Sequence, residues 1–171
     1  MRVLEGKRTA LLGVLSLVFT YLFFLEYLRP FRSVSIPFDL PGFHYPLADY
    51  AFNSLRNGRF PFWDPTIYSG MPFAANTQAA LFYPPSWLLF LGNMGSSPLS
   101  CWSLQEFVFL HVWLAFVLCY VWLRARVSCT AALFGSGIFA YSGFMMLQLQ
   151  HLGFVAGVAW MPLGFRAIDQ A

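Results

Sequence analysis

Apolar residues along this chain gather into four long runs, separated by shorter polar stretches. The runs cover about residues 9–28, 104–123, 130–147 and 152–165. A helix that crosses a membrane needs about 20 consecutive, mostly apolar residues. The first three runs approach or reach that length, whereas the fourth is shorter and contains Pro162. The pattern therefore predicts an all-α polytopic membrane protein with about four transmembrane helices in a single membrane domain, residues 1–171.

The stretch of about residues 29–103, between the first two runs, is predicted to be a large loop with structure of its own. Residues 45–57 have the pattern of an amphipathic helix suited to the membrane surface, and Gly58 is a natural end for it. Its apolar side is predicted to hold Leu47, Tyr50, Ala51, Ser54 and Leu55. Residues 79–91 are apolar but too few to span, so they predict a second, interfacial or re-entrant helix. Between these two helices, residues 61–73 carry the Pro and Gly spacing of a turn region.

The composition supports a membrane location for the chain. Hydrophobic residues make up 58% and charged residues only 10%, against roughly 45–50% and about 25% in soluble domains. The small net charge of +3 is spread along the chain, without the basic run that nucleic-acid binding requires. The three cysteines have no metal-ligand spacing, and no nucleotide-binding glycine motif is present.

Basic residues indicate the orientation, because Lys and Arg favour the cytoplasmic side of a membrane. An N-terminus inside the cell places six of them inside, namely Arg2, Lys7, Arg8, Arg124, Arg126 and Arg166. It leaves four outside, namely Arg29, Arg32, Arg56 and Arg59. We therefore expect a cytoplasmic N-terminus, with the long loop and the turn Gln148–His151 together on the exterior face.

Asp39 is the first candidate for chemistry. It follows the first predicted span by about ten residues, among apolar residues and prolines. Removing an unpaired carboxylate from water costs free energy, so a carboxylate in such surroundings is expected to be paired or to have a function. It could serve as a general base toward a hydroxyl group or as a ligand for a divalent cation. It could equally form a salt bridge with Arg29 or Arg32, or cap a short turn.

Further polar and aromatic side chains are candidates for substrate binding. They are His44, Tyr45, Trp63, Gln78, Gln148 and His151. Most have a simpler alternative: Tyr45 as an interfacial anchor, Trp63 as a ring packed against lipid, Gln78 as a turn or cap residue, and the Gln148–His151 group as a polar span end. Asp49 and Asp64 are expected to be structural, Asp49 on a solvated helix face and Asp64 opening a turn before Pro65.

The loop carries an ordered series of motifs. The string DLPGFHYP, residues 39–46, is followed by SLRNGRFPFWDP, residues 54–65, then by GMPF, residues 70–73, and by the segment from Gln78 to Pro84. This series resembles the first exterior loop of the YfhO-like bacterial membrane proteins. The resemblance covers most of residues 37–91. A weaker likeness covers residues 130–165, which include Trp160-Met161-Pro162.

The YfhO-like family is similar to the GT-C superfamily of membrane glycosyltransferases. The resemblance implies a GT-C-like helical fold whose first exterior loop bears helices parallel to the membrane. It implies a polyprenyl-phosphate-linked sugar as donor and an acidic active-site residue, which Asp39 matches. In some GT-C enzymes this acid binds a divalent metal, Mg²⁺ or Mn²⁺ here, and in others it acts as a base. Arg56 or Arg59 could then stabilise the charge of the departing phosphate.

A second acidic motif that GT-C enzymes carry in a later exterior loop is absent from these residues. The chain also shows only about four predicted spans where the superfamily core has more, so we expect it to be the N-terminal portion of a longer protein. The prediction is a glycosyltransferase of the bacterial inner membrane, in contact with lipids, that passes a sugar to a cell-envelope acceptor. A lipid or polysaccharide transport or flippase component and a non-catalytic membrane assembly protein are the alternatives.

Overall fold

The computed structural model describes residues 2–28, 34–96 and 98–171, with side chains from residue 11 onward. Helices account for 68% of the structure, so the predicted all-α class is confirmed. The chain divides into two compact units. The span unit holds the described residues of Met1–Val34, Val108–Leu149 and Phe154–Ala171, and the loop unit holds those of Ser35–Phe107 and Gln150–Gly153. Arg29 and Arg32, which entered the orientation argument and the alternatives for Asp39, lie outside the described residues.

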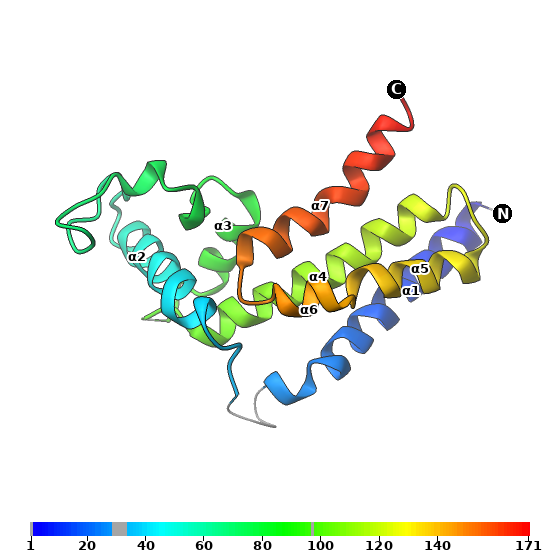
Figure 1. Ribbon diagram of the computed structural model, residues 1–171, viewed down its shortest axis with the longest axis horizontal. Helices are drawn as coiled ribbons and strands as arrows, with labels where there is room; N and C mark the ends of the chain where they lie inside the picture. Colours follow the sequence, from blue (N-terminus) through cyan, green and yellow to red (C-terminus); the bar gives the residue numbers. More distant parts are fainter. Residues whose placement is uncertain (1, 29–33, 97) are drawn as a thin grey trace. The chain divides into compact units, whose positions relative to one another are not determined.

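The span unit is built from long apolar helices (Figure 1). They are α1, Arg2–Phe23, with a short 3₁₀ turn η1, Leu25–Tyr27; α4, Cys101–Leu123, whose first turns belong to the loop unit; α5, Cys129–Ala140; α6, Gly143–Leu147; and α7, Leu152–Ile168. Two segments, Cys101–Leu123 and Cys129–Leu147, are long and apolar enough to cross a membrane. The apolar helices Leu11–Phe23 and Leu152–Ile168 are shorter. Two of the four predicted spans thus have the required length in the described residues.

Most of the apolar surface of Cys129–Leu147 is open, because only 22% of its apolar window is buried. The core helix of a soluble protein would be covered by its neighbours. Here Phe134 and Ile138 are among the most exposed large side chains of the chain. Exposed apolar faces of this kind mark surfaces that meet lipid or another protein. This observation favours a membrane protein.

The predicted third span, residues 130–147, is not one continuous helix. α5 ends at Ala140, and α6 begins at Gly143 after a break at Tyr141 and Ser142. The Ser142 hydroxyl accepts a hydrogen bond from the Met145 backbone N–H at 3.3 Å, which starts the new helix. A serine at this position satisfies an amide that the helix itself cannot pair. The predicted span of residues 130–147 is therefore built from two helical pieces, α5 and α6, within the apolar segment Cys129–Leu147.

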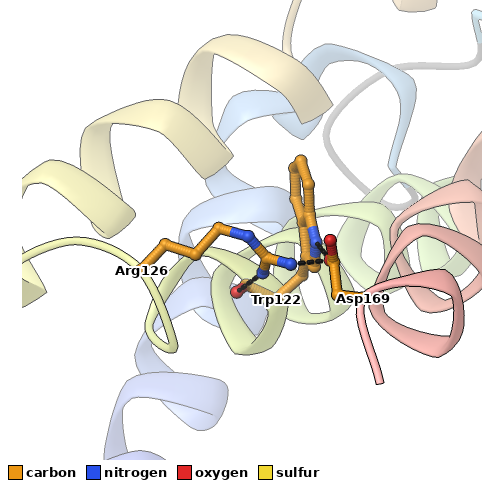
Figure 2. A network of polar contacts seen from close by, with 3 residues as sticks. All are labelled: Trp122, Arg126 and Asp169. Carbon is orange, nitrogen blue, oxygen red and sulfur yellow. Dashed lines mark hydrogen bonds and ion pairs between the residues drawn. The ribbon is translucent and has the colours of Figure 1, made fainter. Parts of the chain in front are cut away.

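Figure 2 shows a polar network that joins the end of α4 to the end of α7 within the span unit. The Trp122 indole N–H donates to Asp169 at 2.8 Å, and the Arg126 guanidinium forms an ion pair with the same carboxylate. Arg126 also lies over the Trp122 ring, 4.8 Å from its centroid. The cation–π contact fixes Arg126 against Trp122 at the end of α4. The ion pair and the hydrogen bond to Asp169 then connect this end to the end of α7.

The loop unit begins with a π-helical turn η2, Leu40–His44, that continues directly into α2, Tyr45–Arg56. The 3₁₀ turns η3, Phe73–Ala75, and η4, Thr77–Ala79, follow, and then α3, Pro84–Gly92. The prediction of a helix over residues 45–57 is confirmed to within one residue. Its buried side is formed by Leu47, Ala48, Ala51 and Phe52. Ala48 and Phe52 were not assigned to this side from the sequence, and the predicted Tyr50 and Ser54 are only half-buried.

The second predicted loop helix begins later than expected. Residue 80 has a left-handed backbone, with φ 49° and ψ 30° at Ala80, and the helix starts only at Pro84. Pro84 and Pro85 fit the first helical turn, where the backbone N–H groups have no partner inside the helix. The apolar run of residues 79–91 therefore contains a turn followed by the short helix α3.

Candidate functional site

Asp39 sits on a strained turn that presents its side chain. Phe38, directly before it, has φ 64°, which is rare for a bulky residue. Asp39 then occupies the N-cap position of η2, but its side chain makes no cap hydrogen bond. Its Oδ2 instead lies 3.2 Å from Nε2 of His151, and the Asp39 side chain is 52% exposed. Strained residues of this kind cluster at functional sites, and the exposed carboxylate is available to a ligand.

His151 comes from a distant part of the sequence. It lies at the residue before α7 begins, and residues 150–153 belong to the loop unit. The sequence suggested only that the Gln148–His151 turn and the loop lie on the same face. The structure goes further, because it pairs His151 with Asp39 itself. Of the simpler alternatives for Asp39, the side-chain cap is not formed, and the ion pair with Arg29 or Arg32 lies outside the described residues. Among the described residues, the carboxylate pairs with His151.

His44 closes the cluster from the end of η2. It is buried, with 5% of its surface exposed, and its Nδ1 has no hydrogen-bond partner among the described residues. Burial lowers its pKa below the ordinary value of 6.5; Asp39 acts against this shift, and His151 adds to it. Asp39 and His151 are therefore both close enough to His44 to influence its pKa. Because its pKa is lowered, His44 is neutral at pH 7, with one imidazole nitrogen unpaired. We call Asp39, His44 and His151 the Asp39 cluster.

Gln78 reaches the same end of α7. It belongs to η4, where the Asn76 side chain accepts a hydrogen bond from its backbone N–H at 3.0 Å. A side-chain carbon built on Gly153 would lie 3.8 Å from Oε1 of Gln78. Gly153 follows His151 by two residues, so the Gln78 amide lies beside the segment that carries His151. Gln78 is thus a residue of the turn η4 that Asn76 caps, and its side chain lies beside this segment.

Four other predicted residues lie apart from the Asp39 cluster. The hydroxyl of Tyr45 donates to the Leu99 carbonyl at 2.8 Å, and the Arg56 guanidinium donates to the Ser96 carbonyl at 2.7 Å. Tyr45, Arg59 and Trp63 line a groove beside α2 with a volume of about 1140 Å³. Among the described residues, neither Arg56 nor Arg59 forms an ion pair with Asp39. The suggested pairing of Asp39 with one of these arginines stays a prediction.

The groove beside α2, which we call the α2 groove, is lined by one side of α2 and by the chain that follows it. Its lining residues are Tyr45, Pro46, Asp49, Tyr50, Asn53, Ser54, Asn57, Arg59, Phe60, Pro61, Trp63, Asp64, Pro65, Thr66 and Ile67. All of them belong to the loop unit. The sequence placed several of these residues near a substrate but did not indicate that they form one concave surface.

Asp64 has the structural role expected of it, whereas the prediction that Asp49 lies on a solvated helix face was wrong. The Asp64 carboxylate is buried and accepts from the backbone N–H of Thr66 at 2.8 Å and from its hydroxyl at 2.6 Å, which forms the predicted turn. Asp49 lies half-buried rather than on a freely solvated face, and it accepts from the Leu99 backbone N–H at 2.8 Å. The Asp-Pro-Thr order is the sequence signal for the first contact. No local signal announces the second, since its partner is distant in the chain.

Gln148 belongs to the span unit, where it is half-buried at the end of α6. Its predicted place beside the loop therefore stays a prediction. Gln105, which the sequence did not single out, is buried in the loop unit, and its Oε1 accepts from the Ile36 backbone N–H at 2.7 Å. This bond ties the segment that leads into Asp39 to the start of α4.

The described residues contain no group of three or more His, Cys, Asp or Glu side chains arranged to hold a metal ion. Asp39 is the one carboxylate of the Asp39 cluster. Mg²⁺ is commonly bound by one or two carboxylates together with substrate phosphates and water. Asp39 fits that mode only in company with a phosphate-bearing substrate.

The chain matches no protein-family model, no curated protein and no solved structure. The likeness of residues 37–91 to the YfhO-like loop therefore rests on the motifs alone. What the geometry adds is a half-exposed carboxylate on a strained turn, paired with one histidine and close to another.

Proposed function

We propose that this chain is the first part of a GT-C-type glycosyltransferase of the YfhO-like kind, which uses a polyprenyl-phosphate-linked sugar at the exterior face of the bacterial inner membrane. The observation that carries the proposal is the pairing of Asp39 with His151 beside the neutral, buried His44. A lipid-phosphate donor holds its reactive carbon near the membrane surface. The proposed reaction therefore needs an acid or base in an exterior loop rather than inside the bilayer.

Asp39 acts as the base in this proposal. A hydroxyl of the acceptor gives its proton to the carboxylate, and its oxygen bonds to the anomeric carbon of the donor sugar. The bond from that carbon to the phosphate oxygen breaks, and the phosphate leaves with the electron pair. Oδ2 is held by His151, so Oδ1 is the oxygen that receives the proton. Proton transfer of this kind contributes about 10²- to 10⁴-fold to a rate.

In this proposal, His151 positions the Asp39 carboxylate by a hydrogen bond. His44 is the buried, neutral side chain beside it. A neutral His44 brings no positive charge of its own next to the carboxylate. Its unpaired Nδ1 can exchange a hydrogen bond with a hydroxyl or phosphate oxygen. If Mg²⁺ or Mn²⁺ is required, Asp39 would hold it together with the donor phosphate, where the ion would neutralise the leaving group.

Replacement of Asp39 by Asn tests the proposal. The amide keeps the shape of the side chain but cannot accept the proton, so transfer should fall by about 10²-fold or more. The assay would follow radiolabelled sugar from polyprenyl-phosphate glucose, galactose or mannose into envelope material, in membranes that contain the full-length protein. Glu106→Gln, which changes an exposed carboxylate on α4, serves as the matched control and should keep the full rate.

The outcome depends on the rate measured at equal amounts of inserted protein. A wild-type rate in Asp39→Asn would reject Asp39 as the base. His151→Gln, which can still donate a hydrogen bond to the carboxylate, should lose less activity than Asp39→Asn if His151 only positions it. An equal or larger loss would show that His151 has a direct part in the reaction.

A further inference from the structure

The α2 groove is separate from the Asp39 cluster but begins beside it. Tyr45 lines the groove, and its neighbour His44 belongs to the cluster. The groove has a volume of about 1140 Å³. Pockets for drug-sized ligands measure about 300–1,000 Å³. The α2 groove is therefore large enough for a ligand of more than one ring.

The polar groups in the groove include several that the fold leaves free. Among the described residues, no hydrogen bond engages the side-chain amide of Asn53, the guanidinium of Arg59 or the indole N–H of Trp63. The lining carries two carboxylates, those of Asp49 and Asp64, against the single guanidinium of Arg59. This balance disfavours a phosphate or another anion. It suits a neutral ligand with many hydroxyl groups, which can both donate and accept hydrogen bonds.

Trp63 supplies a fixed aromatic surface for such a ligand. Its ring lies against Gly70, since a side-chain carbon at that position would come within 2.6 Å of the indole. The Tyr50 hydroxyl donates to the backbone carbonyl of Trp63 at 2.7 Å. Asp64, the next residue, exchanges two backbone hydrogen bonds with Met71, each 2.9 Å long. Even so, 55% of Trp63 is exposed. A large aromatic ring that is held rigidly and left open costs little entropy when a ligand stacks on it.

We propose that the α2 groove is a saccharide subsite that binds a neutral oligosaccharide, with Trp63 as the stacking surface and Asn53 and Arg59 as hydrogen-bonding partners. Under the proposed transferase function, this saccharide is the acceptor, and its end is presented to the Asp39 cluster through the junction of η2 and α2. The role as acceptor rests on that function. The binding itself does not.

Saturation-transfer NMR on the full-length protein in lipid nanodiscs measures this binding directly. The probes are maltotriose, chitotriose and mannotriose, and glycoside detergents are avoided because they carry sugar rings of their own. We expect at least one probe to receive saturation from the protein. Trp63→Ala should weaken that binding by about tenfold, which corresponds to the energy of one aromatic contact. Tyr68→Ala removes an aromatic ring that is 87% exposed and outside the groove, and it should change nothing.

Further variants and probes distinguish the possible outcomes. Asn53→Leu, which removes an amide without altering a bond of the fold, should also weaken binding. The proposal is overturned if none of the three probes binds, if both groove variants bind as tightly as the wild type, or if inorganic phosphate displaces the sugar. Asp39→Asn should bind the probe normally. Intact binding with lost transfer in that variant supports both proposals, whereas lost transfer without any binding to the wild type rejects the groove alone.

Discussion

The two units of this chain satisfy their polar groups in different ways. In the span unit, some hydroxyl groups bond one turn back in their own helix, as Thr20 does to the Ser16 carbonyl at 2.8 Å and Ser136 to the Ala132 carbonyl at 2.6 Å. Its side-chain bonds between helices, such as those of Trp113 and Trp122, add to a backbone that the helices already pair. In the loop unit, side chains bond to backbone far away in the sequence, as Gln105 does to Ile36. Helices pair their own backbone, whereas an irregular segment needs outside partners. The loop unit therefore depends on individual long-range hydrogen bonds.

Backbone strain separates the units in the same way. Among the described residues, the non-glycine positions with positive φ are Phe38, Tyr68, Ser69 and Ala80. All belong to the loop unit. Phe38 precedes Asp39, and Ala80 follows Gln78 by two residues, so the strain lies next to residues of the candidate site. Such strain persists only where the surrounding structure holds it in place.

The strongest test of the comparison is Gln105→Leu. The change keeps the volume of this buried side chain but removes the acceptor for the Ile36 backbone N–H, which is itself buried. An unsatisfied buried donor costs about 1–3 kcal/mol, so we expect the free energy of unfolding to fall by about 2 kcal/mol. Titration with SDS in mixed micelles, followed by circular dichroism, measures it.

The neighbouring substitution Glu106→Gln is the control for Gln105→Leu. Glu106 is exposed on the same helix turn, so its replacement should leave stability within about 0.5 kcal/mol of the wild type. If Gln105→Leu were as stable as this control, the loop unit would not depend on the bond to Ile36.

The span unit should respond less to the loss of a hydrogen bond. Thr20 and Tyr141, on α1 and directly after α5, share a hydroxyl–hydroxyl bond of 2.6 Å. Bonds between helices in membranes are worth about 0.6 kcal/mol on average. A double-mutant cycle with Thr20→Val and Tyr141→Phe should therefore give a coupling energy of about that size. A coupling as large as the loss predicted for Gln105→Leu would contradict the distinction between the two units.

Relief of backbone strain should give the smallest change in the free energy of unfolding, and this change should be an increase rather than a loss. Ala80→Gly removes the left-handed strain of about 1–2 kcal/mol, but glycine loses about 0.5–1 kcal/mol more entropy on folding. We expect a net stabilisation of about 0.5 kcal/mol in the same titration. Ala75→Gly, at an exposed position in η3 without positive φ, is the control and should destabilise the protein slightly. Destabilisation by both variants would show that Ala80 is not strained.

Local patterns were sufficient for the helix α2 and for one turn. The amphipathic stretch of residues 45–57 and Gly58 predicted α2 to within a residue, because helix periodicity and the glycine stop act within a few residues. The Asp64 turn was predicted from Asp64 before Pro65 for the same reason. The break between α5 and α6 was missed, since a serine inside an apolar run does not reveal whether it will cap a new helix.

The site was predicted as a list of residues rather than as an arrangement. Asp39, His44 and His151 were all named from the sequence, but nothing local indicated that they meet or that Trp63 and Arg59 belong to a separate groove. Gln105 was not named at all. Its role depends on an amide at Ile36, and a partner at that separation leaves no local pattern.

The sequence by itself determined the helical class, the apolar runs and the candidate residues, because hydrophobic periodicity, turn chemistry and composition are properties of neighbouring residues. Only the tertiary structure decided that His151 pairs with Asp39 and that α2 and the chain after it enclose a groove. Such contacts form when the folded chain offsets the entropy of closing a long loop with buried surface and hydrogen bonds. That balance depends on the whole loop unit at once.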